Sequence, residues 1–222
     1  MMDRLSTPDL EHMYSDIMKG LSVHFDSPLI TDILETARRF PRLQLGYALN
    51  RNQVTSKTWL VDSLYQTGQG RLGRVGVLGG WYGVLGALLL HDHRFDIERI
   101  ESVDIDPSCE GVALSLNRSN VDDGRFAFRL ADMHEIDYMS ADYDLIVNTS
   151  CEHLDDLPSW YAKVPEGTLL VMQSNNYFGI EGHVNCVNSL AEFKAQVPVA
   201  EELFAGELAL KKYTRYMVIG RR

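Results

Sequence analysis

Residues 75–83 read Val-Gly-Val-Leu-Gly-Gly-Trp-Tyr-Gly, and this stretch decides the fold that we expect. A short apolar run of the kind that forms a buried strand ends in glycines, and an apolar helical run, 84–90, follows at once. Asp104 lies at the end of a second apolar run, 25 residues after Gly79. Glycines let the backbone approach a ligand closely, and an acid about 20 residues further on can bind a ribose diol. The pattern predicts a strand, loop and helix that bind an adenosine-containing cofactor.

The net charge and composition of the chain indicate which kinds of molecule it binds. A net charge of −10 over 222 residues argues against nucleic acid or an anionic membrane as the main partner, so a small molecule is expected. The three cysteines have no CxxC spacing, which fits a reducing compartment. The first residues hold no apolar segment of signal-peptide length, and the run 84–90 is too short to span a bilayer. We therefore expect a cytoplasmic enzyme; its oligomeric state is left open.

Residues 1–70 are predicted to be helical. Helix starts are indicated at Thr7-Pro8 and Ser27-Pro28, and a third helix is expected over 56–67. The polar run 52–57 leads into that third helix, where it either closes over a substrate or caps the helix. Three short amphipathic helices before a nucleotide-binding sheet suggest a cap or lid, and simple packing against the sheet is an equally open interpretation.

Residues 71–222 alternate between strand and helix patterns. The predicted strands are 75–78, 100–105, 126–130, 144–149, 168–173, 202–208 and 215–219. Short apolar runs separated by helices indicate a parallel sheet covered on both faces. No helix separates the last two strands, which are therefore expected to form an antiparallel hairpin at the edge of the sheet. The predicted class is α/β, with one Rossmann-like domain over 71–222.

This layout resembles the class I S-adenosylmethionine (SAM) dependent methyltransferases, from residue 74 to the C-terminus. Their glycine loop has the form Gly-x-Gly-x-Gly, and the matching residues are Gly79, Gly80, Trp81, Tyr82 and Gly83. Trp81 stands at the middle glycine, and Val77 stands where the family usually has an acid. An NAD-type Rossmann domain is the alternative, but it explains neither this glycine pattern nor the terminal hairpin.

The resemblance also assigns roles around a bound SAM. It implies that Asp104 binds the ribose hydroxyls and that Asp132 contacts the adenine amino group. Met133 is then expected on the adenine face, and Asn148 is expected to face the sulfonium and the substrate. Trp81, Tyr82 and Tyr177 are candidates to present ring faces to the positive sulfonium, with core packing as the alternative.

Two polar clusters follow predicted strands, where ligands bind in parallel sheets. They are Asn-Thr-Ser-Cys-Glu-His at 148–153 and Gln-Ser-Asn-Asn-Tyr-Phe at 173–178. The candidate catalytic residues are Asn148, Glu152, His153, Ser174, Asn175 and Tyr177. Glu152 and His153 are the candidates for proton transfer, because either can be tuned toward neutral pH. The alternative is that these side chains only cap turns.

A metal site is not expected from the sequence. Cys151, His153, His183 and Cys186 combine into a pattern that resembles zinc ligation, but their spacing is not that of a standard finger. Cys151 is interpreted as small apolar filler rather than as a nucleophile.

Methyl transfer from SAM to a small acceptor is the first functional hypothesis. The second uses SAM as the substrate: its amino group attacks the γ-carbon of its own aminocarboxypropyl arm. This attack gives azetidine-2-carboxylate and methylthioadenosine, with Asn148, Ser174 or Asn175 holding the amine. A SAM-binding regulator or partner subunit is the non-enzymatic alternative. The sequence does not decide among them, and methyl transfer leads because it is the commoner use of the fold.

Overall fold

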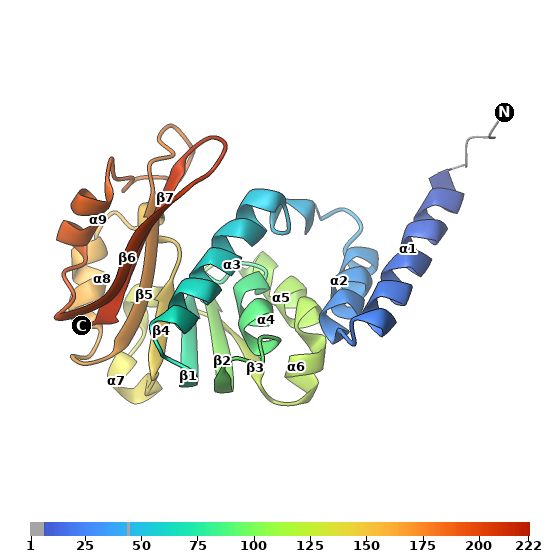
Figure 1. Ribbon diagram of the computed structural model, residues 1–222, viewed down its shortest axis with the longest axis horizontal. Coiled ribbons are helices and arrows are strands. Elements are labelled where there is room, and N and C mark those ends of the chain that lie inside the picture. Colours follow the sequence, from blue (N-terminus) through green and yellow to red (C-terminus); the bar gives the residue numbers. More distant parts are fainter. Residues whose placement is uncertain (1–6, 44) are drawn as a thin grey trace.

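The computed structural model describes residues 7–43 and 45–222 (Figure 1). Residues 1–6, on which part of the signal-peptide expectation rests, lie outside the described residues. Seven strands form one sheet in the order β3-β2-β1-β4-β5-β7-β6. Their bounds are β1 Arg71–Leu78, β2 Asp96–Asp104, β3 Phe126–Leu130, β4 Leu145–Asn148, β5 Leu169–Asn175, β6 Glu201–Ala209 and β7 Thr214–Arg221. All seven predicted strands are present; β3 has the predicted bounds, and the other six differ at one or both ends.

The strand directions confirm the predicted α/β fold. Strands β1 to β5 pair in parallel, whereas β7 runs antiparallel to both β5 and β6. The chain reverses at β1, with β2 and β3 on one side and β4 and β5 on the other. In open parallel sheets, such a reversal leaves a crevice at the carboxyl ends of the strands, where ligands bind.

Helices cover both faces of the sheet (Figure 1). They are α1 Thr7–His24, α2 Pro28–Arg39, α3 Arg51–Gln66, α4 Val84–Leu90, α5 Glu110–Leu116, α6 Arg118–Asp122, α7 Tyr138–Ala141, α8 Leu157–Lys163 and α9 Leu190–Gln196. One hydrophobic core joins α3, α4 and α5 to the strands, and a second joins α7, α8 and α9 to the opposite face. None of the helices in the described ranges combines the length and apolarity needed to cross a bilayer.

The third helix begins earlier than predicted. Asn50 caps it, because its side-chain oxygen accepts a 3.0 Å hydrogen bond from the backbone N–H of Gln53. The polar run 52–57 therefore forms the first turns of α3 instead of a loop that precedes it. A 3₁₀ turn, Pro107–Cys109, comes directly before α5.

The three N-terminal helices differ in how they meet the sheet. Leu60 and Leu64 of α3 are fully buried in the same core as β1. Helix α2 is tied to the α5–α6 region, where Asp32 accepts a hydrogen bond from the backbone N–H of Ser119. Helix α1 lies beyond α2, at the end of the molecule remote from β6 (Figure 1). The boundary near residue 70 and a lid role for residues 1–70 stay predictions, and α3 belongs structurally to the main core.

Candidate active site

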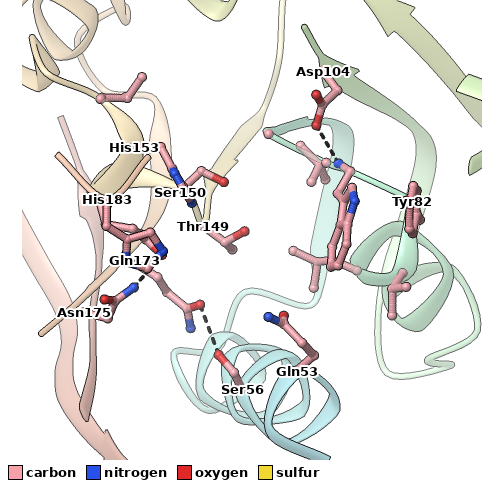
Figure 2. Close-up of a pocket in the computed structure, with 18 of the residues that line it drawn as sticks. Gln53, Ser56, Tyr82, Asp104, Thr149, Ser150, His153, Gln173, Asn175 and His183 are labelled. Carbon is pink, nitrogen blue, oxygen red and sulfur yellow. Dashed lines mark hydrogen bonds between the residues drawn. The ribbon is translucent and has the colours of Figure 1, made fainter. Parts of the chain in front are cut away.

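A cavity of about 1190 Å³ opens at the carboxyl ends of the parallel strands. Figure 2 shows Asp104 and Tyr82 on one side of it and His153, His183 and Asn175 on the other. The N-terminal half of α3 contributes Gln53, Ser56 and Lys57 to its wall, whereas α1 and α2 contribute none of the lining residues in the described part of the chain. Pockets for one drug-sized ligand measure about 300–1,000 Å³. This cavity is large enough for a cofactor and a second small molecule.

The glycine loop forms one side of the cavity, and steric limits explain two of its glycines. A Cβ on Gly79 would lie 2.5 Å from Ser150 Oγ, and a Cβ on Gly80 would lie 2.0 Å from Ser102 Oγ. Gly79 also has a φ of +61°. These positions require glycine, as expected of a loop whose backbone approaches a ligand closely.

Trp81 occupies the middle of the loop in a left-handed conformation, with a φ of +49°. That conformation costs an L-residue about 1–2 kcal/mol. Glycine does not bear this cost, which explains why related loops have a glycine at this position. Asp104 stabilises it, because Asp104 Oδ2 accepts a 2.7 Å hydrogen bond from the backbone N–H of Trp81. The Trp81 ring stacks on Tyr82 with centroids 4.6 Å apart, and both residues line the cavity.

The two predicted adenosine-binding acids both line the cavity. Asp104 Oδ1 accepts a 3.0 Å hydrogen bond from the backbone N–H of Asp106, so each Asp104 oxygen is oriented by the backbone. Asp132 Oδ1 accepts from the backbone N–H of His134 and starts a 3₁₀ turn that carries Met133. Each oxygen of these carboxylates keeps acceptor capacity for a ligand.

Three predicted site residues do not line the cavity: Gly83, Asn148 and Ser174. Gly83 begins α4 with a φ of +72°, and its carbonyl accepts a hydrogen bond from Asn117. Asn148 is fully buried and positions its neighbours: its amide contacts Met133 Sδ at 3.5 Å, and its oxygen accepts from the backbone N–H of Ser150. Ser174 Oγ is buried and has no hydrogen-bond partner among the described residues.

The position of Ser174 follows from the true length of β5. The strand continues through Asn175, so the polar residues 173–175 belong to the strand and not to a loop after it. Successive side chains of a strand point to opposite faces. Gln173 and Asn175 line the cavity, while Ser174 faces the other way. Ser174 and Asn148 do not line the cavity, and their contact with an amine stays a prediction. For Ser174 that prediction assumed a loop after residue 173, where the strand in fact continues.

A buried ion pair lies at the end of the cavity away from the glycine loop. Arg215 Nη2 lies 3.3 Å from Glu152 Oε1, and the two residues are 8% and 2% exposed. Asn175 Nδ2 donates a 2.5 Å hydrogen bond to the same Glu152 oxygen, and Arg215 Nη1 donates to the carbonyl of Thr149. Within the described residues, Glu152 Oε2 and Arg215 Nε have no hydrogen-bond partner. Buried polar atoms are almost always hydrogen-bonded, and a ligand bound in this cavity would supply the partners that these two atoms lack.

Lys57 adds a second cation to this end. Burial, helped by the nearby charge of Arg215, lowers the pKa of Lys57 to about 8, against the opposing attraction of Glu152. Its Nζ donates a 2.7 Å hydrogen bond to Gln53 Oε1. A lysine with such a pKa exists partly as the free amine near neutral pH and can accept a proton there.

Two histidines complete the wall. Nδ1 of His153 lies 2.9 Å from the carbonyl oxygen of Gly182, and Nδ1 of His183 lies 3.0 Å from that of Tyr177. Their ring centroids are 4.7 Å apart and nearly perpendicular. Burial, the largest influence on His183, lowers its pKa. Tyr177 stacks on Tyr213 with centroids 5.0 Å apart, and both rings line the cavity.

Arg215 was not predicted from the sequence, and neither Lys57 nor Gln173 was singled out from its polar run. Arg215 stands beside Tyr216 and the apolar run 217–219 of β7, and a charged residue next to so apolar a stretch was the available signal.

Cys151 is buried, and burial raises the pKa of its thiol well above the usual value. A thiol in that state is not a reactive nucleophile.

Comparisons with known proteins establish the fold. Neither a protein-family model nor a curated protein sequence matches the chain. Among solved structures, it resembles the N-methyltransferase NodS from Bradyrhizobium japonicum WM9 in complex with S-adenosyl-L-homocysteine (SAH), with a TM-score of 0.59 and 14% identity over 83% of this chain and 98% of that one. The fold is that of the Rossmann-like methyltransferases.

Two further structures share this methyltransferase fold. Magnesium protoporphyrin IX methyltransferase from Synechocystis PCC 6803 with bound SAH has a TM-score of 0.58 and 13% identity over 77% of this chain and 84% of that one. The [4+2]-cyclase SpnF has a TM-score of 0.59 and 10% identity over 77% and 82% of the two chains. Identities this low carry the fold but not the chemistry, which has to be argued from the site.

Proposed function

We propose that this protein is a SAM-dependent transferase that methylates a small polar acceptor. The observation that carries the proposal is one cavity of about 1190 Å³ with two unlike ends. One end offers a glycine loop with Asp104 and Asp132, and the other offers a buried cluster of charged and polar side chains. The fold and the SAH bound in two solved structures of that fold support the choice of cofactor.

The cofactor end supplies the groups that adenosine requires. Asp104 would accept hydrogen bonds from the ribose hydroxyls, and Asp132 would accept one from the adenine amino group. Met133 would pack on the adenine ring, and Trp81 and Tyr82 would present aromatic faces toward the positive sulfonium. SAM supplies an activated methyl group, so the protein has mainly to align the acceptor and exclude water.

The acceptor end would orient the nucleophile and remove its proton. Gln173, Asn175 and Arg215 offer hydrogen bonds to a polar acceptor from a wall that is itself held rigidly. Lys57, with a pKa of about 8, would take the proton that a hydroxyl group loses as it attacks, or that an ammonium group loses before the free amine attacks. The nucleophile's electron pair forms the new bond to the methyl carbon, and the electrons of the broken C–S bond leave with SAH.

Two measurements test this function. Calorimetric titration of the purified protein with SAM and SAH should show binding at one site. Mass spectrometry after incubation with SAM and fractionated metabolite pools should then show SAH together with a product 14 mass units heavier than its acceptor. Absence of SAM and SAH binding would contradict the assignment of the cofactor.

Cyclisation of the aminocarboxypropyl arm is the second candidate, and Lys57 favours it. The amine of SAM must lose a proton before it attacks the γ-carbon, and a buried lysine with a lowered pKa is suited to remove it. The size of the cavity favours a separate acceptor instead. Incubation with SAM alone separates the two: methylthioadenosine with azetidine-2-carboxylate supports cyclisation, whereas SAH formed only with an added acceptor supports methyl transfer.

A further inference from the structure

We propose that Glu152, His153 and His183 bind a divalent transition metal ion at the acceptor end of the cavity. One potential ligand atom from each residue lies within 4.8 Å of the other two. All three residues line the cavity. The proposal deepens the proposed function, on which its catalytic role rests, because the metal would hold the acceptor. No metal was expected from the sequence. The proposed ligand set keeps His153 and His183 of the zinc-like pattern and has Glu152 in place of its two cysteines.

The hydrogen bonds of the two histidines determine which ring nitrogens are free. Nδ1 of His153 faces the carbonyl oxygen of Gly182, and Nδ1 of His183 faces that of Tyr177. A carbonyl oxygen only accepts hydrogen bonds, so each Nδ1 must carry the proton. In the neutral rings, both Nε2 atoms therefore present lone pairs.

Glu152 supplies the independent indication that a ligand is missing. The residue is 2% exposed, and its Oε1 is occupied by Asn175 and Arg215. Its Oε2 has no hydrogen-bond partner among the described residues. Glu152 thus has an unpartnered buried oxygen, and it lies in one cluster with two imidazoles that each keep a lone pair. A single bound cation would satisfy these three acceptors.

Each of the three ligands also has a partner that fixes its orientation. Backbone carbonyls hold both histidines, and Asn175 holds the carboxylate through Oε1. Metal-binding histidines almost always donate their second ring N–H to a carbonyl or carboxylate in this way. Arg215 meets Glu152 at Oε1, which leaves Oε2 free to bind the metal.

The ligand set indicates the kind of ion. Two imidazoles and one carboxylate suit Zn²⁺ and Fe²⁺ and leave coordination positions open for substrate. Ligands about 2.1 Å from one ion lie within about 4.2 Å of one another, so the present 4.8 Å separation requires a small closure. His153 is exposed and His183 is only partly buried, so there is room for this closure while each Nδ1 contact to its carbonyl is kept.

The surroundings indicate the class of acceptor. A metal with open positions binds a hydroxyl oxygen and makes it easier to deprotonate. Arg215 lies beside Glu152, and its Nε has no hydrogen-bond partner among the described residues, so it suits a carboxylate. We therefore infer an acceptor that carries a hydroxyl group and a carboxylate on one small framework.

Titration with Co²⁺ tests the site without relying on turnover. Protein stripped with a chelator should bind one Co²⁺ and develop visible d–d absorption bands. His183→Ala and His153→Ala should each weaken binding at least 10-fold, while His93→Ala, which removes an exposed histidine elsewhere, should not. Circular dichroism of each variant checks that the fold is retained. Glu152→Gln is a third variant, which is informative only if it also remains folded.

The outcomes separate this proposal from the proposed function. No d–d bands, or bands equally strong in His153→Ala and His183→Ala, would overturn the metal site. If His93→Ala weakens the bands, the ion binds at the surface near His93, and the proposed metal site is again overturned. The same samples are titrated with SAM. Co²⁺ binding without SAM binding supports the metal site and contradicts the methyltransferase, and SAM binding without Co²⁺ binding does the reverse.

Discussion

Asp104 accepts a 2.7 Å hydrogen bond from the backbone N–H of Trp81, and this contact joins the predicted ribose-binding acid to the glycine loop. Trp81 needs the contact because its left-handed backbone, with a φ of +49°, is unfavourable for a residue with a side chain. One carboxylate therefore both shapes the loop and faces the cavity. This double role leads to the first prediction.

Asp104→Ala should weaken SAM binding at least 100-fold. The variant loses the acceptor for the ribose hydroxyls and the support for Trp81, and hydrogen bonds to charged groups are worth about 1.5–3 kcal/mol each. Calorimetric titration with SAM measures the effect. Asp123→Ala, a change at an exposed position after α6, is the matched control and should bind SAM normally. SAM affinity that survives Asp104→Ala would refute the cofactor assignment at this end of the cavity.

Gly79→Ala should destabilise the protein more than Gly124→Ala. Both glycines have positive φ values, +61° and +73°, so both variants bear the backbone cost of about 1–2 kcal/mol. Only at Gly79 does the new methyl group meet a neighbour, because Ser150 Oγ lies 2.5 Å from the Cβ position, whereas Gly124 faces open space. Chemical denaturation of the two variants measures the difference. Equal losses of unfolding free energy would show that Ser150 does not constrain the loop.

Lys57→Met should stabilise the protein near neutral pH and lose that advantage at high pH. The pKa of Lys57 is about 8 in the folded protein and 10.5 as the ordinary value. Between these values the unfolded chain holds a proton that the native state has released, so the stability of the wild type rises with pH. The penalty of burying charged Lys57 is thus present below pH 8 and relieved by about pH 10.5.

The size of this effect is about 3 kcal/mol, because each pKa unit corresponds to about 1.4 kcal/mol. The difference in unfolding free energy between Lys57→Met and the wild type should therefore shrink by about that amount from pH 7 to pH 10.5. Lys211→Met, at an exposed position, controls for the general titration of lysines. A difference that stays constant across this range would contradict the lowered pKa.

Arg215→Leu should cost about 3–5 kcal/mol of unfolding free energy, because it leaves the buried carboxylate of Glu152 without its cation. The double variant Arg215→Leu with Glu152→Gln should recover part of that loss, since the remaining amide is neutral and can still meet Asn175. Denaturation of the two single variants and the double variant measures the coupling between the residues. Additive losses would show that the two side chains do not act as a pair.

The glycine loop and its acids could be predicted because their signals are local. The sharp turn at Gly79, the acid at Asp104 and the acid at Asp132 depend on strand ends that the apolar runs mark in the sequence. Element boundaries are harder to predict, because capping and pairing set them. The extension of β5 through Asn175 by pairing with β7 is one example, and it turned Ser174 away from the cavity.

The acceptor end required the tertiary structure, because its members come from distant parts of the chain. Lys57 arrives on α3, Glu152 and His153 follow β4, and Arg215 comes from the antiparallel strand β7. The sequence by itself determined the α/β class, the succession of strands along the chain, the terminal hairpin and the glycine loop, since periodicity and glycine placement act over short range. Only the tertiary structure decided which charged side chains lie together. Glu152, Arg215 and Lys57 become neighbours only when β7 and α3 pack beside the parallel strands.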